Sequence, residues 1–278
     1  MLLTAVNVLS YHNDAASTGQ NLSETALTLS NVNTSTFGKL FSTPVDGQTY
    51  AQPLYMAGVN ITAGSHQGVH NVSYVVTEHD SLYAIDADTG TVLWQDALLL
   101  PEAALTAGGH TVTVSTVSNS DVNSNDVNPE IGITSTPAID PANGFLYLTA
   151  KTKQIVDGVA TSPHYVYNLY KVNVASGTFT GTVIGDTTFS GGAYTFNSGP
   201  SILDSVTGAA AAGSGRVAIP GTNPQQYLIN FNTLRQMNRS AVTLYNGNVY
   251  LAFASHGDNN PYHGWILGYN ETTLAPSA

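Results

Sequence analysis

The chain contains no cysteine, and this absence removes several kinds of chemistry at once. Without thiols there is no disulfide, no cysteine nucleophile and no cysteine-ligated zinc site. Positive charge is also scarce, because 7 Lys and Arg residues stand against 18 Asp and Glu residues, for a formal net charge of −11. An acidic surface repels a phosphate backbone, so we expect no nucleic-acid partner.

Long apolar runs are missing as well. No run approaches the roughly 18 residues that a membrane-spanning helix needs, and no basic amphipathic stretch suits a membrane surface, so we expect no membrane insertion. Residues 1–7 form an N-terminal tail that lacks the basic flank and the length of a signal peptide. The heavy use of Asn, Thr, Ser and Gly resembles that of bacterial secreted proteins. We therefore expect an extracytoplasmic location, periplasmic or secreted, with no signal sequence in this chain.

Helical periodicity is scarce, and short β-branched and aromatic runs separated by Gly, Asn and Asp predict an all-β fold of many short strands. The clearest unit runs from Val72 to Trp94, "VSYVVTEHDSLYAIDADTGTVLW". Two strands joined by residues 78–81 lead into a hairpin turn at residues 86–90, where glycine supplies a positive φ angle. A third strand follows the turn, and residues 52–58 supply one more strand upstream.

The unit recurs twice. "GITSTPAI", "FLYLTA" and "YVYNLYKVNV" make a second copy, and "VYLAFA" and "WILGY" lie in a third. Asp86, Asn173 and Asn270 occupy the same position after a strand, where a short polar side chain starts a turn. Copies near residues 46–98, 131–185 and 239–278 predict radial or stacked repetition. We expect the long stretches 101–129 and 186–238 to be surface excursions that separate the copies of the repeat.

These residues resemble the quinoprotein-like β-propellers, the group that contains the pyrroloquinoline quinone (PQQ) dehydrogenases. The phrase "LYAIDADTGTVLW" is similar to their repeat signature, and "YHND", "DGQTYAQPLY" and "SHGDNNPYHGW" are similar to an uncharacterised secreted bacterial branch. The resemblance implies a β-propeller of four-stranded antiparallel blades over residues 8–278. A closed ring needs about six to eight blades, and about three are present, so we expect an open or incomplete ring. The resemblance also implies PQQ and calcium as cofactors, although the paired cysteines of the family's alcohol dehydrogenases are absent.

In a four-stranded blade, the loop between the second and third strands and the approach to the first strand lie on one face. Residues from these segments should therefore converge on one rim around the central channel. The candidates for a ligand-binding rim are Gln52, Glu78, His79, Asp80, Glu130, Thr136, Arg239, His256, Asp258 and His263. Arg239 stands out because cations are so few. Its guanidinium can clamp a carboxylate ligand or a quinone oxygen, or it can pair with Glu130 or Glu78 and fix the blades in register, which we favour.

Three further groups have both a chemical and a plain structural interpretation. His256, Asp258 and His263 offer imidazole and carboxylate ligands for a transition metal, but their spacing matches no specific motif and suits an enlarged loop. The stretch "DVNSNDVN" at residues 121–128 offers oxygen ligands for calcium, or is a solvated loop. Glu78 and Glu130 make a carboxylate pair for acid–base work, or are two independent rim residues.

Three functions remain open on the sequence. The leading one is an extracytoplasmic module that presents a ligand- or partner-binding rim without catalysis. The second is a PQQ- and calcium-dependent oxidoreductase that acts on an alcohol or sugar. The third is a structural segment of a larger cell-surface protein. Because an incomplete propeller exposes a strand edge, we also expect self-association.

Overall fold

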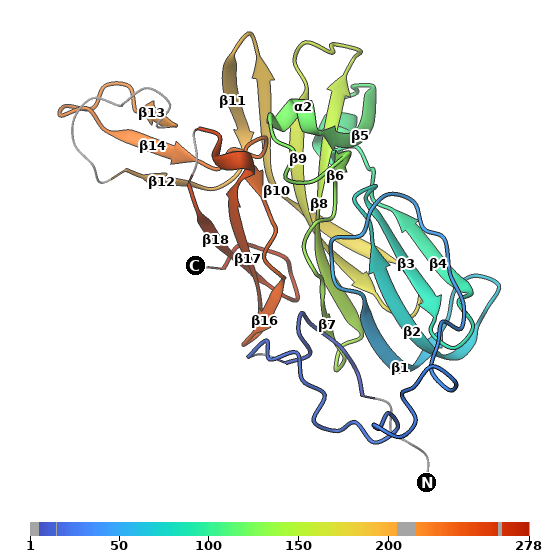
Figure 1. Ribbon diagram of the computed structural model, residues 1–278. Coiled ribbons are helices and arrows are strands. Elements are labelled where there is room, and N and C mark those ends of the chain that lie inside the picture. Colours follow the sequence, from blue (N-terminus) through green and yellow to red (C-terminus); the bar gives the residue numbers. More distant parts are fainter. Residues whose placement is uncertain (1–5, 15, 205–214, 261–262, 278) are drawn as a thin grey trace.

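The structure is a computed structural model that describes residues 6–14, 16–204, 215–260 and 263–277. The protein is all-β, with its strands gathered into several antiparallel sheets (Figure 1). This confirms the fold class expected from the short β-branched runs. No helix in the described ranges has the length and apolar character needed to cross a membrane.

The first repeat, here called unit 1, is a four-stranded sheet in the order β1-β2-β3-β4. Its strands are β1 (Leu54–Ile61), β2 (Gly68–Val76), β3 (Ser81–Asp86) and β4 (Val92–Ala97). Asp86 ends β3 and starts the turn as expected, because its Oδ1 accepts hydrogen bonds from the backbone N–H groups of Asp88 at 3.0 Å and Thr89 at 2.7 Å. The expected turn chemistry is therefore present.

Units 2 and 3 repeat this arrangement. The strands of unit 2 are β7 (Ala138–Asp140), β8 (Phe145–Val156), β9 (His164–Asn173) and β10 (Phe179–Ser190). Those of unit 3 are β16 (Thr243–Tyr245), β17 (Asn248–Ser255) and β18 (Trp265–Asn270). Asn173 and Asn270 start the turns at the position of Asp86. In unit 3 the bridge between Tyr269 and Pro276 stands where the fourth strand begins.

The two stretches expected as surface excursions carry much more sheet than predicted. After the short helix α1 (Ala103–Ala107), β5 (Val112–Ser118) pairs with the far half of β8, and β6 (Glu130–Ile131) pairs with β5. Helix α2 (Asn119–Val122) follows β5, while β11 (Ala193–Ser198) extends the sheet beyond β10. Strands β12 (Ser201–Leu203), β13 (Arg216–Ala218) and β14 (Tyr227–Asn230) form a separate sheet, and β15 (Gln236–Met237) pairs with β17. Unit 2 thus lies within a seven-stranded sheet.

Neighbouring units are joined by one contact that repeats. The Tyr74 hydroxyl on β2 donates a 2.9 Å hydrogen bond to the carbonyl oxygen of Val174 in unit 2. The equivalent Tyr147 on β8 donates at 2.9 Å to the carbonyl oxygen of Glu271 in unit 3. Each acceptor directly follows the turn-forming asparagine, so unit 2 packs on unit 1 in the same way as unit 3 packs on unit 2. Two apolar core clusters fill these two interfaces.

The same equivalence identifies a face of unit 3 that no described residue covers. Leu82 in β3 and Leu169 in β9 are both 0% exposed. Ile266 holds the same position in β18, four residues before the turn-forming asparagine, yet it is 79% exposed. Tyr250, which corresponds to Tyr74 and Tyr147, is also only partly buried. The surface that is core in units 1 and 2 is therefore open in unit 3 as far as the described residues are concerned.

Candidate functional site

The main candidate site is a cavity of about 330 Å³ where the approaches to the first strands of units 2 and 3 meet. Its lining residues are Tyr11, Tyr50, Thr134, Thr136, Arg239, Ser240 and Ala241. We call it the rim cavity. A larger groove of about 480 Å³ between the N-terminal segment, β7 and β16 shares Tyr11 and Ala241 with it. The rim cavity is therefore continuous with the space along the inner strands.

Thr136 joins the three units at this point. Its Oγ1 accepts a 2.9 Å hydrogen bond from the backbone N–H of Gln52, and its carbonyl oxygen accepts one at 2.9 Å from the N–H of Val242. The Gln52 side chain in turn accepts a hydrogen bond at 3.1 Å from the backbone N–H of His12. The predicted convergence of Gln52, Thr136 and the segment after Arg239 is therefore present.

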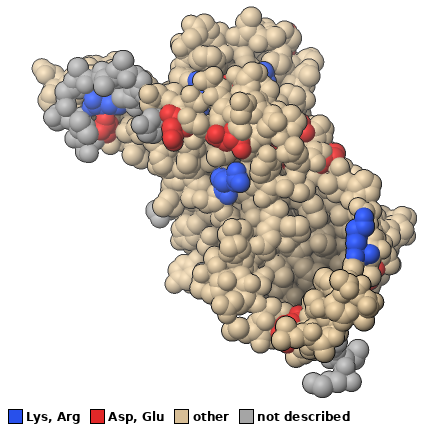
Figure 2. Space-filling view, in the orientation of Figure 1, with Lys and Arg blue, Asp and Glu red and all other residues tan. Residues whose placement is uncertain are grey.

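Arg239 is exposed in the rim cavity, and its guanidinium carbon lies 5.3 Å from the centre of the Tyr50 ring. Within the described ranges this guanidinium makes no hydrogen bond and no ion pair. The expected pairing with Glu78 or Glu130 is not formed: Glu130 pairs with His79 at 3.1 Å, and Glu78 accepts hydrogen bonds from Gly132 and Thr134. Charged side chains are sparse over the face drawn in Figure 2, and the whole chain has 7 Lys and Arg residues, so a cation in a cavity is a notable feature of this protein.

Glu78 lies beneath the cavity and is fully buried. Its Oε2 accepts hydrogen bonds from the backbone N–H of Gly132 at 2.8 Å and from the Thr134 hydroxyl at 3.0 Å. Burial raises the pKa of Glu78 to about 7, and these two hydrogen bonds and the nearby Arg239 charge only partly oppose that shift. The Thr134 hydroxyl thus links the cavity lining to a carboxyl group that titrates near neutral pH.

Asp80 lies beside Glu78 and is also fully buried, with a φ angle of 56°. Neither carboxyl oxygen makes a hydrogen bond to a described residue. Burial raises the pKa of Asp80 well above its usual range, and the charges of Glu78 and Glu130 push it in the same direction. The close carboxylate pair is therefore Glu78 with Asp80, two residues apart in sequence. Glu130 instead accepts hydrogen bonds from His79 and from the Thr116 hydroxyl.

The sequence predicted that His256 lies on an exposed rim, but the structure places it in the interior. It is fully buried, and its Nε2 lies 3.1 Å from the Nζ of Lys151 on β8. Lys151 also donates to the carbonyl oxygens of Leu234 and Gln236, at 3.0 Å each. Burial and the neighbouring cations lower the pKa of His256 to about 2, so the imidazole is neutral and accepts a hydrogen bond from Lys151. It holds unit 3 against unit 2.

Residues 257–259 of the loop "SHGDNNPYHGW" pack on the segment 121–128. The N–H of Gly257 donates to the Asp126 carboxylate at 2.6 Å, and the Asn259 amide donates to the carbonyl oxygen of Asn123 at 2.8 Å. Asp258 is exposed, and residues 261–262 lie outside the described residues. Over the described ranges, His256, Asp258 and His263 do not bring their ligand atoms together as a metal site requires. The two loops that each suggested a cation site instead pack on each other.

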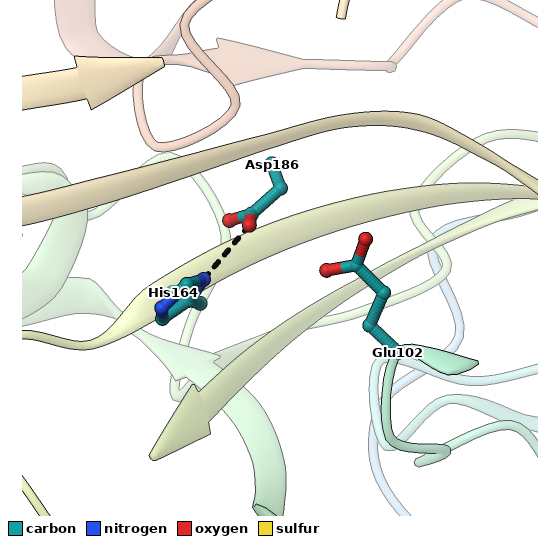
Figure 3. Close-up of side chains that lie close together, drawn as sticks. All are labelled: Glu102, His164 and Asp186. Atoms are coloured by element: carbon teal, nitrogen blue, oxygen red, sulfur yellow. Dashed lines mark hydrogen bonds and ion pairs between the residues drawn. The ribbon is translucent and has the colours of Figure 1, made fainter. Parts of the chain in front are cut away.

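A second polar cluster was missed by the sequence analysis: Glu102, His164 and Asp186 (Figure 3). Glu102 lies in the stretch 101–129, which was expected to be a surface excursion, while His164 begins β9 and Asp186 lies within β10. His164 Nδ1 lies 2.7 Å from Asp186 Oδ2, and the Glu102 carboxyl group is turned toward both. The pairing of the long strands β9 and β10 brings His164 and Asp186 together, and the segment before α1 adds Glu102. The sequence marks this cluster only by a histidine and an aspartate 22 residues apart on neighbouring strands. Such pairs are too common to identify a site.

No family model matches the chain, and no curated protein matches it either. Function must therefore be argued from the rim cavity and the polar clusters themselves.

Proposed function

We propose that this protein is part of an extracytoplasmic β-propeller whose rim cavity binds a small ring compound bearing a carboxylate, with Arg239 as the clamp. The observation that carries this proposal is the free guanidinium of Arg239 in a cavity, in a chain that has 7 cations in all. A guanidinium recognises a carboxylate through two parallel hydrogen bonds. The low charge content and the abundance of Asn, Thr, Ser and Gly support a location outside the cytoplasm.

The other lining residues support a ring as the rest of the ligand. Tyr11 and Tyr50 offer aromatic surface, and Tyr50 already lies beside the guanidinium. Thr136 Oγ1 accepts from Gln52 and retains its own hydrogen for a ligand oxygen. A sugar acid or an aromatic acid would use the aromatic faces, the hydroxyls and the cation together.

The propeller part of the proposal is supported by the repeated contact between units. Tyr74 and Tyr147 donate to equivalent carbonyl oxygens, and Tyr250 occupies the same position in unit 3. We therefore infer that the open face of β17 and β18 receives a further four-stranded unit, whose turn carbonyl accepts the Tyr250 hydroxyl. Burying an exposed side chain such as Ile266 against a further unit would stabilise the assembly by about 1.5–3 kcal/mol.

We expect the open face of unit 3 to cause self-association of this chain. Ile266→Lys should lower the self-association constant by about tenfold or more, because it places a charge on that face without disturbing the core. The matched control is Val69→Lys in unit 1, since Val69 is an apolar β2 residue that is 72% exposed. Sedimentation velocity over a concentration series measures the effect. Equal association constants for the two variants would contradict the inference.

The quinoprotein oxidoreductase is less well supported by the residues present. PQQ carries three carboxylates, and Arg239 is the single cation among the described residues that line the rim cavity. Glu78 and Asp80 are buried and are not among the lining residues, so no described lining residue offers a carboxylate to calcium. The described rim residues do not fit a quinone–calcium pair, and we derive no catalytic step through one.

Calorimetric titration tests the proposed ligand class, with galacturonate and galactose as a pair that differs in one carboxylate. We expect galacturonate to bind more tightly than galactose, and Arg239→Ala to weaken galacturonate binding by about 10- to 100-fold, the usual worth of a charged hydrogen bond. Lys39→Ala, which removes an exposed charge from outside the cavity, should leave binding unchanged. Failure of galacturonate and benzoate to bind at millimolar concentration, or equal affinities for Arg239→Ala and the wild type, would overturn the proposal. Tight binding of PQQ with calcium would instead favour the oxidoreductase.

A further inference from the structure

The long hairpin of unit 2 places a histidine and an aspartate on the same face of the sheet. His164 at the start of β9 pairs with Thr188 on β10, and Asp186 pairs with Val166. Because side chains alternate along a strand, His164 and Asp186 are diagonal neighbours on one face. Gln154 on β8 lies directly opposite His164 and is fully buried.

Glu102 reaches this face from another part of the chain. It stands immediately before α1, and its backbone N–H donates a 2.8 Å hydrogen bond to the Oε1 of Gln154. Gln154 in turn donates to the carbonyl oxygen of Leu100 and to the Thr152 hydroxyl. The buried amide therefore fixes the backbone of Glu102 beside the strand pair, and the carboxyl group points to His164 and Asp186 (Figure 3).

The three side chains already have a separation that suits one metal ion. One ligand atom from each lies within 4.8 Å of the other two, and His164 Nδ1 and Asp186 Oδ2 are 2.7 Å apart. Ligands at bond lengths of about 2.0–2.2 Å from one ion lie about 3–3.5 Å from each other in octahedral or tetrahedral geometry. Small side-chain rotations thus suffice to enclose an ion.

Two buried carboxylate oxygens in this cluster also lack a partner. Asp186 has a side chain that is 3% exposed, yet its Oδ1 makes no hydrogen bond to any described residue, and neither does the Oε2 of Glu102. Unpartnered buried carboxylate oxygens are costly, and a divalent cation would satisfy both.

We propose that Glu102, His164 and Asp186 bind one divalent first-row transition-metal ion, with Zn²⁺ as the best match. One imidazole nitrogen and two carboxylates suit this class, whereas magnesium and calcium prefer oxygen ligands alone. The ion takes the place of the proton between His164 Nδ1 and Asp186 Oδ2. The bound imidazole is neutral and carries its one proton on Nε2, and if the ring was protonated on both nitrogens, the second proton leaves to solvent. Three protein ligands leave one position of a tetrahedral site open to water or to a further ligand. The site lies on the long hairpin of unit 2 and shares no residue with the rim cavity.

Asn197 on β11 is a further polar side chain at the cluster. Its amide nitrogen donates to Asp186 Oδ2 at 2.9 Å and to the Thr188 hydroxyl at 2.7 Å. When a cation binds, rotation of the amide exchanges this nitrogen for the Oδ1 oxygen, which changes a donor facing the ion into an acceptor. The cluster thus needs no backbone movement to accept an ion.

Equilibrium dialysis of Zn²⁺ against the metal-free chain, with the metal measured by elemental analysis, tests the proposal. We expect one tightly bound equivalent in the wild type. Glu102→Gln, which keeps the shape and the Gln154 contact, and His164→Ala should each weaken binding by about tenfold or more, because each removes a ligand. Co²⁺ provides a second readout, since a four-coordinate site gives intense visible absorption that both variants should lose.

The chain provides a matched control for an ordinary histidine–aspartate pair. His110 Nδ1 lies 2.7 Å from Asp157 Oδ2, the same separation as in the cluster, and the described residues add no third ligand there. His110→Ala should therefore leave zinc binding unchanged. Zinc affinity that is unaffected by Glu102→Gln, zinc lost equally in His110→Ala, or no bound equivalent in the wild type would show that His164 and Asp186 form only a structural ion pair. If His164→Ala does not fold, Glu102→Gln alone decides the outcome.

Discussion

Replacing Gly132 by alanine should destabilise the protein by about 3 kcal/mol or more, because an added methyl group has no room. A Cβ atom at this position would lie 2.3 Å from the backbone carbonyl oxygen of Glu78 and 2.7 Å from Asp80 Oδ1. The first neighbour is backbone and the second belongs to a fully buried side chain, so neither moves away easily. The shift would also disturb the hydrogen bond from the Gly132 N–H to Glu78.

Chemical denaturation followed by the fluorescence of Trp94 and Trp265 measures this loss. Gly38→Ala is the control, since a Cβ atom there meets nothing within 4 Å and the φ angle is not positive. We expect the control to change the unfolding free energy little. A Gly132→Ala variant as stable as the control would mean that the Glu78–Asp80 segment adjusts freely, and the carboxyl pair under the rim cavity would not be rigidly placed.

The repeat is the part of the fold that the sequence predicted best. Asp86, Asn173 and Asn270 each start a turn through short-range hydrogen bonds, and such local chemistry can be read from neighbouring residues. The strands of the two predicted excursions could not be read in this way. Strand β5 is held by its pairing with the far half of β8, and a partner so distant in sequence leaves no local signal.

The candidate site was predicted in part for the same reason. Gln52, Thr136 and Arg239 precede the first strands of successive units, so the repeat itself places them together. His256 also follows the repeat, but the buried amine of Lys151 turns its ring inward. The cluster of His164 with Asp186 depends on how far β9 and β10 extend, and sequence patterns define the ends of strands least well.

Glu78→Gln should become a stabilising substitution as the pH rises. The carboxyl pKa is 4.5 when unperturbed and is raised to about 7 in the folded protein, so the folded state holds this proton more tightly than the unfolded chain does. The wild type therefore loses stability between about pH 4.5 and 7, and the shift amounts to about 3 kcal/mol. Glutamine cannot ionise, and its carbonyl oxygen can still accept from Gly132 and Thr134.

The measurement is the difference in unfolding free energy between Glu78→Gln and the wild type at several pH values from 4.5 to 8. Subtracting one unfolding free energy from the other removes the contributions that both proteins share, including those of His256 and Lys151. The pKa values of these two groups are lowered, so their contribution to stability rises with pH, whereas that of Glu78 falls. We expect the variant to match the wild type near pH 4.5 and to exceed it by about 3 kcal/mol at pH 8. Glu24→Gln is the control, because Glu24 is exposed, its pKa is lowered, and it is ionised throughout this range. A difference that stays constant with pH would mean that Glu78 keeps its charge when buried, with Arg239 as its counter-ion, and the guanidinium would then not be free to bind a ligand.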